Sequence, residues 1–196
     1  MKKNKNGVII AVANQKGGVG KTTTTINLAG CLGVLEYKTL IIDADPQANS
    51  TTGTGFDLHN ITQSLYDCMV NEALAKDVIL KSEIPHLDVM PSHIDLVGAE
   101  IEMINYPNRE SVLKKILEPL VDDYDFIVID ETIGSARFLG DALKNFARIG
   151  NNIILGNVNI ANSCKLSFGT FILQKTTLVS NINTMPYTSI YKNLKI

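Results

Sequence analysis

The sequence has few cysteines, no long apolar run and, in its last part, no acidic residue. Cys31, Cys68 and Cys164 form an odd set without the spacing of a metal site, which favours reduced thiols in a cytoplasmic protein. No stretch of about 18 uncharged apolar residues occurs, so we expect no transmembrane helix. The apolar run from Val8 to Ala13 is short and leads into polar residues, which is typical of a buried strand and not of a secretory signal.

Charge is distributed unevenly along the 196 residues. Residues 1–141 contain 12 basic and 20 acidic residues, whereas residues 142–196 contain 6 basic residues and no acid. The two parts therefore carry −8 and +6, which together give the net charge of −2. A basic segment of this kind can be a nucleic-acid footprint. The alternative is that the last part is an atypical tail.

Short apolar runs alternate with amphipathic segments. The runs predict buried strands at 7–13, 39–42, 86–90, 126–129 and 153–155. Helical periodicity predicts helices at 22–35, 61–70, 73–81, 95–104 and 109–121, the last with Asn108 as its N-cap. This alternation predicts one α/β domain over residues 1–196, built on a doubly wound, mostly parallel sheet with helices on both faces.

A glycine-rich segment lies between the first strand and the first helix. Its glycines allow several backbone N–H groups to point at one anion, and the start of the helix adds further donors. Lys21 would supply a positive charge to the β- and γ-phosphates, and the Thr22 hydroxyl would bind Mg²⁺. The segment predicts a P-loop NTPase that binds ATP and Mg²⁺; a glycine-rich turn with two solvated lysines is the alternative. The predicted nucleotide-contacting residues are Lys16, Gly17, Gly18, Val19, Gly20, Lys21, Thr22 and Thr23.

Two aspartates follow predicted parallel strands. Asp43 comes after the strand at 39–42, and Asp130 after the strand at 126–129. Ligands of open α/β sheets bind at the carboxyl ends of the strands, so both aspartates are candidate Mg²⁺ ligands, Asp130 through a water molecule. Asp45 lies two residues further into the loop. One interpretation of Asp45 is a turn residue before Pro46.

The form of the phosphate loop is specific to one group of ATPases. Gln15 stands where an ordinary P-loop has glycine, and a second lysine, Lys16, precedes the glycines. With this deviant motif, the sequence resembles the ParA/Soj partition ATPases of the ParA/MinD group over about residues 7–143. The stretches that carry the resemblance are Asn14–Thr23, Asp43–Asn49, Pro91–Glu100 and Tyr124–Asp130.

The resemblance implies a catalytic set of Lys16, Lys21 and Asp45. In this family Lys16 would reach across a homodimer formed in the ATP state and neutralise charge on the partner's γ-phosphate. Asp45 would position the attacking water. The resemblance further implies weak ATPase activity, non-specific DNA binding and a ParB/Spo0J-like DNA-binding partner. Such a protein would be cytoplasmic and nucleoid-associated, would segregate chromosome or plasmid DNA, and is not expected at a membrane.

After Asp130 the resemblance weakens. Residues 131–135 replace a proline-containing loop of the family, and residues 144–196 form the atypical basic segment. Either the domain is divergent and Lys165 to Lys195 form a substitute basic surface, or the reading frame is disrupted near residues 131–150. The missing acids and motifs favour the second interpretation. Two other functions remain open: a MinD-like ATPase that positions division machinery on a membrane, and a truncated, inactive nucleotide-binding remnant.

Overall fold

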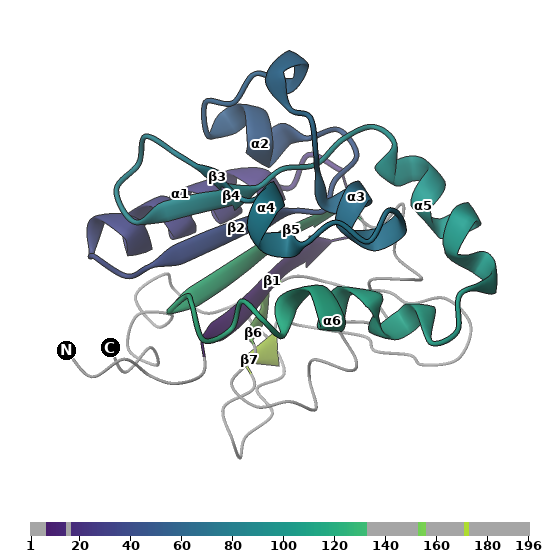
Figure 1. Cartoon of the computed structure of the whole chain (residues 1–196). Coiled ribbons are helices and arrows are strands. Elements are labelled where there is room, and N and C mark those ends of the chain that lie inside the picture. Colours follow the sequence, from purple (N-terminus) through teal and green to yellow (C-terminus); the bar gives the residue numbers. More distant parts are fainter. Residues whose placement is uncertain (1–6, 15–16, 133–152, 156–170, 173–196) are drawn as a thin grey trace.

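A computed structural model describes residues 7–14, 17–132, 153–155 and 171–172 (Figure 1). Within these residues the strands form one sheet in the order β3-β4-β2-β5-β1-β6-β7. The atypical basic segment, residues 144–196, lies outside the described residues except for β6 and β7. The strands are β1 Val8–Asn14, β2 Thr39–Asp43, β3 Leu80–Lys81, β4 Leu87–Met90, β5 Phe126–Thr132, β6 Ile153–Leu155 and β7 Phe171–Ile172.

The sheet is mostly parallel, as the sequence predicts. β4, β2, β5, β1 and β6 run parallel to one another, while β3 and β7 pair antiparallel with β4 and β6. Every residue of β2 and β4 is buried, which explains why both strands are apolar over most of their length. The predicted strand at 153–155 is confirmed as β6.

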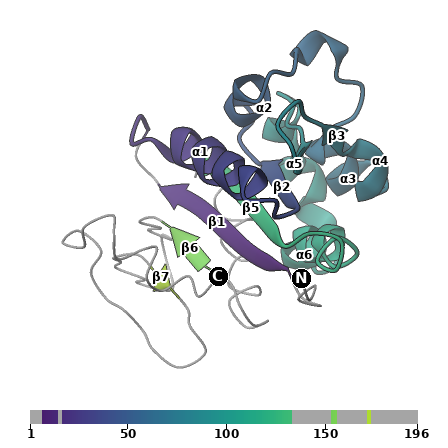
Figure 2. The same ribbon diagram turned by 90° about the vertical axis from the view of Figure 1, so that its left-hand side faces the viewer.

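Helices cover both faces of the sheet (Figure 2). α1 packs on one face, where Ala29 and Leu32 contact a cluster that includes Ile41 and Val128. α3, α4, α5 and α6 lie on the other face, over a second cluster. The doubly wound arrangement is therefore confirmed. The helices are α1 Lys21–Val34, α2 Asn49–Gly53, α3 Leu65–Val70, α4 Ala75–Val78, α5 Leu96–Glu102 and α6 Val112–Leu117.

Several predicted helix boundaries are wrong. The helix predicted at 61–70 begins only at Leu65, because the Asp67 carboxylate accepts the Ser64 N–H at 2.8 Å and starts the helix there. The segment predicted as helix 73–81 is helical only over α4, and Leu80–Lys81 pairs with β4 instead. The prediction for 95–104 divides into α5 and a 3-10 turn at Met103–Asn105.

The prediction for the helix at 109–121 is also too long. A 3-10 turn at Arg109–Ser111 precedes α6, which ends at Leu117. Asn108 stands before that turn with a φ of 56° and makes no side-chain cap, so it acts through its left-handed backbone and not through its amide. No helix in the described part of the chain is long and apolar enough to cross a bilayer.

The packing of α1 on the sheet gives a first prediction, which compares two glycines of one helix. A methyl group at Gly33 would lie 2.5 Å from the backbone oxygen of Pro85, whereas a methyl group at Gly30 would meet nothing within 4 Å. Gly33→Ala should lower the free energy of unfolding by roughly 1–3 kcal/mol through overpacking. Gly30→Ala should raise it by about 0.5–1 kcal/mol, because alanine favours helix. Urea unfolding of the two variants checks this, and a stabilising Gly33→Ala change would contradict the packing.

Candidate nucleotide-binding site

The phosphate loop connects the end of β1 at Asn14 to the start of α1 at Lys21. Gly18 and Gly20 have φ values of 69° and 86°, in the left-handed region that side chains with a Cβ disfavour. A methyl group on Gly17, Gly18 or Gly20 would meet nothing within 4 Å. The space beside the loop is therefore open, and the glycines at 18 and 20 are required by backbone conformation.

The start of α1 presents further donors to this space. Gly20 occupies the N-cap position, and no side chain in the described part of the chain caps the helix. Helix N-termini that lack a side-chain cap are suited to bind anions through their N–H groups and the helix dipole. Lys21 is 9% exposed, Thr22 is half-buried, and Val19 and Thr23 are exposed. Lys16, the second lysine of the motif, lies outside the described residues.

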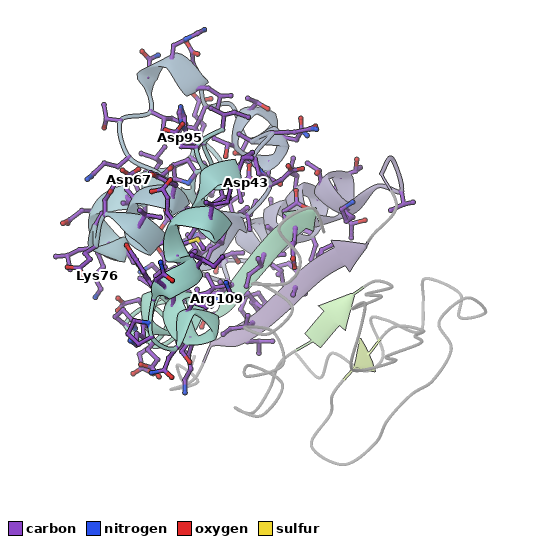
Figure 3. The ribbon with its side chains drawn as sticks, turned by 90° about the vertical axis from the view of Figure 1, so that its right-hand side faces the viewer. Asp43, Asp67, Lys76, Asp95 and Arg109 are labelled. Atoms are coloured by element: carbon purple, nitrogen blue, oxygen red, sulfur yellow. The ribbon has the colours of Figure 1, made fainter. Side chains whose placement is uncertain are left out.

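Asp43 and Asp130 meet at the carboxyl end of the sheet. The two residues are direct partners in the register of β2 and β5, and both are buried. Ser50 donates its hydroxyl to Asp130 Oδ2 at 2.6 Å, and the Thr25 hydroxyl of α1 lies 3.4 Å from Asp130 Oδ1. Figure 3 shows Asp43 among the packed elements, in contrast to Lys76 at the periphery. The structure thus brings together both predicted carboxylate ligands.

α2 supplies two of the three donors that hold Asp43. Both the N–H and the hydroxyl of Thr51 donate to Asp43 Oδ2 at 2.7 Å, and the Asp45 N–H donates to Asp43 Oδ1 at 3.1 Å. The Thr51 hydroxyl also accepts the Ser92 N–H at 3.1 Å. Sequence reasoning missed α2, because a five-residue segment rich in Thr and Gly has low helix propensity and no apolar period. Small hydroxyl residues just after the strand-ending Asp43 were the available signal.

The electrostatics of this pair fit a divalent cation. Burial raises the pKa of Asp43 to about 6, against the hydrogen bonds from Thr51 and Asp45, and the charge of Asp130 raises it further. Among the described residues, no group of three His, Cys, Asp or Glu side chains could hold a metal by itself. Mg²⁺ is usually held by one or two carboxylates together with substrate phosphates and water. The oxygen donors of Thr22, Asp43 and Asp130 fit that pattern.

Asp45 is buried and takes part in a turn. Its Oδ1 accepts the Gln47 N–H at 2.9 Å, and its backbone oxygen accepts the Ala48 N–H at 2.8 Å. The structure therefore confirms that Asp45 takes part in a turn. Its other carboxylate oxygen is not used in this turn, so a role in positioning water stays a prediction.

Glu131 is a fourth acid at this end of the sheet that sequence reasoning did not single out. β5 continues two residues beyond Asp130, so Glu131 lies in the strand and not in a loop. Its side chain is 2% exposed, and Oε2 has no hydrogen-bond partner among the described residues. Burial, and next the charge of Asp130, raise the pKa of Glu131 to about 8, while the positive charge of Lys21 acts in the opposite direction.

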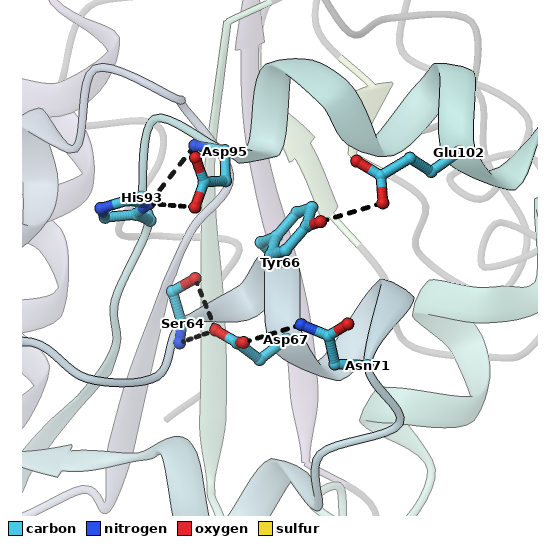
Figure 4. Close-up of polar contacts among 7 residues, drawn as sticks. All are labelled: Ser64, Tyr66, Asp67, Asn71, His93, Asp95 and Glu102. Carbon is cyan, nitrogen blue, oxygen red and sulfur yellow. Dashed lines mark hydrogen bonds and ion pairs between the residues drawn. The ribbon is translucent and has the colours of Figure 1, made fainter.

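A second polar region lies around α3 and the start of α5 (Figure 4). Tyr66 donates to Glu102 at 2.9 Å, His93 pairs with Asp95 at 3.0 Å, and Asp67 accepts bonds from Ser64. A hollow of about 220 Å³ opens beside Ser64, Asp67, His93 and Asp95. The Tyr66–Glu102 hydrogen bond joins α3 to α5, whereas the other contacts lie within one segment.

Comparisons with known proteins identify the family of this chain. The family model described as an AAA domain matches residues 7–143. The chain belongs to this family. It is 46% identical over 124 residues to the sporulation initiation inhibitor protein Soj of Bacillus subtilis, a match of 63% of this chain and 49% of Soj. It is equally identical over 124 residues to the chromosome partitioning protein ParA of Myxococcus xanthus, covering 63% of this chain and 44% of that protein.

Solved structures agree with the sequence match. Cobyrinic acid a,c-diamide synthase of Mycobacterium smegmatis, crystallised with an ATP analog and magnesium, aligns with a TM-score of 0.67 and 28% identity over 76% of this chain and 57% of that chain. The predicted resemblance to the ParA/Soj proteins and the predicted P-loop fold are both confirmed. The chain spans about half the length of the curated relatives that it matches.

The contacts of Thr51 give a second prediction. Thr51→Val keeps the shape of the side chain but removes the donor to Asp43 and the acceptor for the Ser92 N–H, which leaves buried polar groups unsatisfied. The free energy of unfolding should fall by roughly 2–4 kcal/mol. Thr52→Val is the matched control, because Thr52 is exposed on the same helix, and it should change stability by less than about 1 kcal/mol. If urea unfolding shows the same loss of unfolding free energy in both variants, the stabilising role of the Thr51 hydrogen bonds is contradicted.

A third prediction concerns pH. The pKa of Asp43 is about 6 in the folded protein and 3.8 ordinarily, so between these values the folded state binds more protons than the unfolded state. The free energy of unfolding should therefore fall as pH rises from about 4 to about 6, with Asp43 contributing up to about 1.4 kcal/mol per pH unit. Asp43→Asn removes this titration and should make the slope in that window shallower, while the raised pKa of Glu131 still lowers the free energy of unfolding from about pH 4.5 upward. Urea unfolding at several pH values between about 4 and 6 measures this dependence. If the free energy of unfolding depends on pH in the same way in Asp43→Asn and in wild type, the raised pKa of Asp43 is contradicted.

Proposed function

We propose that this chain is a ParA-like ATPase that binds Mg·ATP at the glycine loop. The observation that carries the proposal is the pair of buried carboxylates, Asp43 and Asp130, at the end of the sheet from which the loop leads into α1. Lys21 and the N–H groups of the loop and of α1 would bind the phosphates. The Thr22 hydroxyl and the two carboxylates would hold Mg²⁺, which would neutralise phosphate charge.

The proposal extends to a nucleotide-controlled dimer. ATP would bring two copies together, with Lys16 of each supplying a cation to the nucleotide of the other, and hydrolysis would separate them. The dimer would bind DNA non-specifically through phosphate contacts. A ParB-like partner would stimulate hydrolysis, and the cycle would segregate chromosome or plasmid DNA in the cytoplasm. Support comes from the match to ParA of Myxococcus xanthus and to Soj.

Sedimentation velocity of the Asp45→Ala variant tests this cycle. Loss of the residue proposed to position water should slow hydrolysis and trap the dimer, so the 21.4 kDa chain should sediment as a dimer with Mg·ATP and as a monomer with Mg·ADP. Fluorescent-nucleotide titration confirms binding first, and thermal unfolding confirms that the variant folds. DNA mobility shifts with and without ATP then report the DNA step.

Lys16→Ala and Lys21→Ala separate the two lysines. Lys16→Ala should keep nucleotide binding but lose the dimer, whereas Lys21→Ala should weaken nucleotide binding by about 10- to 100-fold. Lys38→Ala, at an exposed lysine on the opposite end of the strands, is the matched control. If Asp45→Ala sediments as a monomer with both Mg·ATP and Mg·ADP, the proposed dimer is contradicted but the proposed nucleotide binding is not. A wild-type chain that binds no Mg·ATP would contradict the whole proposal.

A further inference from the structure

Ser50 makes the short hydrogen bond that holds Asp130. Its hydroxyl donates to Asp130 Oδ2 at 2.6 Å, and both residues are buried, with exposed fractions of 0% and 1%. The hydroxyl of Thr25 lies 3.4 Å from Oδ1, which is long for such a bond. A hydroxyl bound to an ionised carboxylate at this shorter distance makes a strong, charge-assisted hydrogen bond. Within the described part of the chain, Ser50 is therefore the residue that fixes the orientation of Asp130.

α2 is itself held in place, which gives the Ser50 hydroxyl one direction. The N–H and the hydroxyl of Thr54 both donate to the backbone oxygen of Ser50, at 3.1 and 2.8 Å. Gly53 packs so closely on α1 that a methyl group there would lie 2.5 Å from Ile26 Cδ1. The hydroxyl therefore reaches Asp130 from a helix whose own place is set by packing and hydrogen bonds.

The two acids of the buried pair are held differently. Asp43 Oδ2 accepts two bonds from Thr51 at 2.7 Å, and its Oδ1 accepts the Asp45 N–H at 3.1 Å. Asp130 has one short bond, to Oδ2, and its Oδ1 has only the long contact with Thr25. Carboxylates that serve a metal are themselves hydrogen-bonded, and these outer partners orient them toward the metal. The bonds of Asp130 fit that arrangement, with one oxygen held and the other less engaged.

We propose that Ser50 is a positioning residue for the Mg²⁺ of the nucleotide site; this rests on the proposed function. Its hydroxyl holds Asp130 through Oδ2, so that Oδ1 is left to accept a hydrogen bond from a water molecule of the ion. Among the described residues no group of three His, Cys, Asp or Glu side chains could hold a metal by itself, so each oriented oxygen counts. Ser50 acts on the ion only through Asp130.

The test measures how Mg²⁺ changes the binding of fluorescent ADP to Ser50→Ala. Alanine removes the hydroxyl and keeps the Cβ, so Asp130 loses its short bond and can rotate. The Mg²⁺ concentration that gives half of the full effect on ADP binding should rise by about 10- to 100-fold, as for other outer partners of metal ligands. The Kd for ADP in EDTA should change by less than about 2-fold, since Ser50 acts on the ion and not on the phosphates.

A mutant cycle shows whether Ser50 acts through Asp130. If it does, Ser50→Ala placed in Asp130→Asn should raise the Mg²⁺ requirement by less than about 2-fold beyond Asp130→Asn alone, because residues of one network are not additive. Thr52→Ala is the matched control on the same helix. Thr52 is exposed, and its hydroxyl donates to the backbone oxygens of Ala48 and Asn49, so the Mg²⁺ dependence should stay as in wild type.

Ser50→Cys carries the test if thermal unfolding shows that Ser50→Ala does not fold. Cysteine occupies the same place with a weaker donor, and it should raise the Mg²⁺ requirement by at least about 3-fold. If either folded variant has the Mg²⁺ dependence of wild type, or weakens ADP binding equally with and without Mg²⁺, the inference about Ser50 is overturned and the proposed function stands. If Mg²⁺ does not change ADP binding to wild type, or ADP does not bind, both are overturned.

Discussion

The parallel pairing of β2 with β5 is the constraint on which the nucleotide site depends. Each strand is a run of apolar residues that buries itself on both faces, and each carries an aspartate toward its carboxyl end. The register makes Asp43 and Asp130 direct neighbours. Burial, and to a smaller extent the negative charge of Asp130, raises the pKa of Asp43. A cation or hydrogen-bond donors must therefore be supplied there, and the loops around the strand ends are arranged to do so.

α2 shows how the donors are supplied. Five residues rich in Ser and Thr would form little helix alone, yet Ser50 and Thr51 each place a hydroxyl on one carboxylate of the pair. Thr51 also accepts the N–H of Ser92, which follows β4, so one hydroxyl links the ends of β2 and β4. The carboxylates hold the helix and the helix satisfies the carboxylates. Short hydroxyl residues serve here because longer polar side chains would not fit a fully buried position.

Sequence reasoning predicted the parts of this protein that are set by period and composition. The buried strands and α1 have strong patterns, and the glycine loop and Asp43 are recognised by residue type and spacing. It failed where tertiary contacts decide. The pattern predicts Leu80–Lys81 as the end of a helix, but these residues pair with β4. α3 begins at Leu65 because the Asp67 carboxylate accepts the Ser64 N–H. Ser50 and Thr51 of α2 belong to the site because they donate hydrogen bonds to Asp130 of β5 and Asp43 of β2, and no local sequence pattern predicts such contacts.

The residue after Asp130 shows how a departure from a family pattern can have a structural consequence. A proline has no N–H to donate and tends to end a strand in the middle of a sheet. Glu131 and Thr132 carry no such restriction, and the pairing of β5 with β1 continues through Ala13 and Asn14 to the edge of the phosphate loop. The segment in which the resemblance weakens thus begins within the ladder, with a buried carboxyl group at Glu131. The pairing with β1 fixes the backbone at Glu131 and so sets the face of the sheet on which its side chain lies.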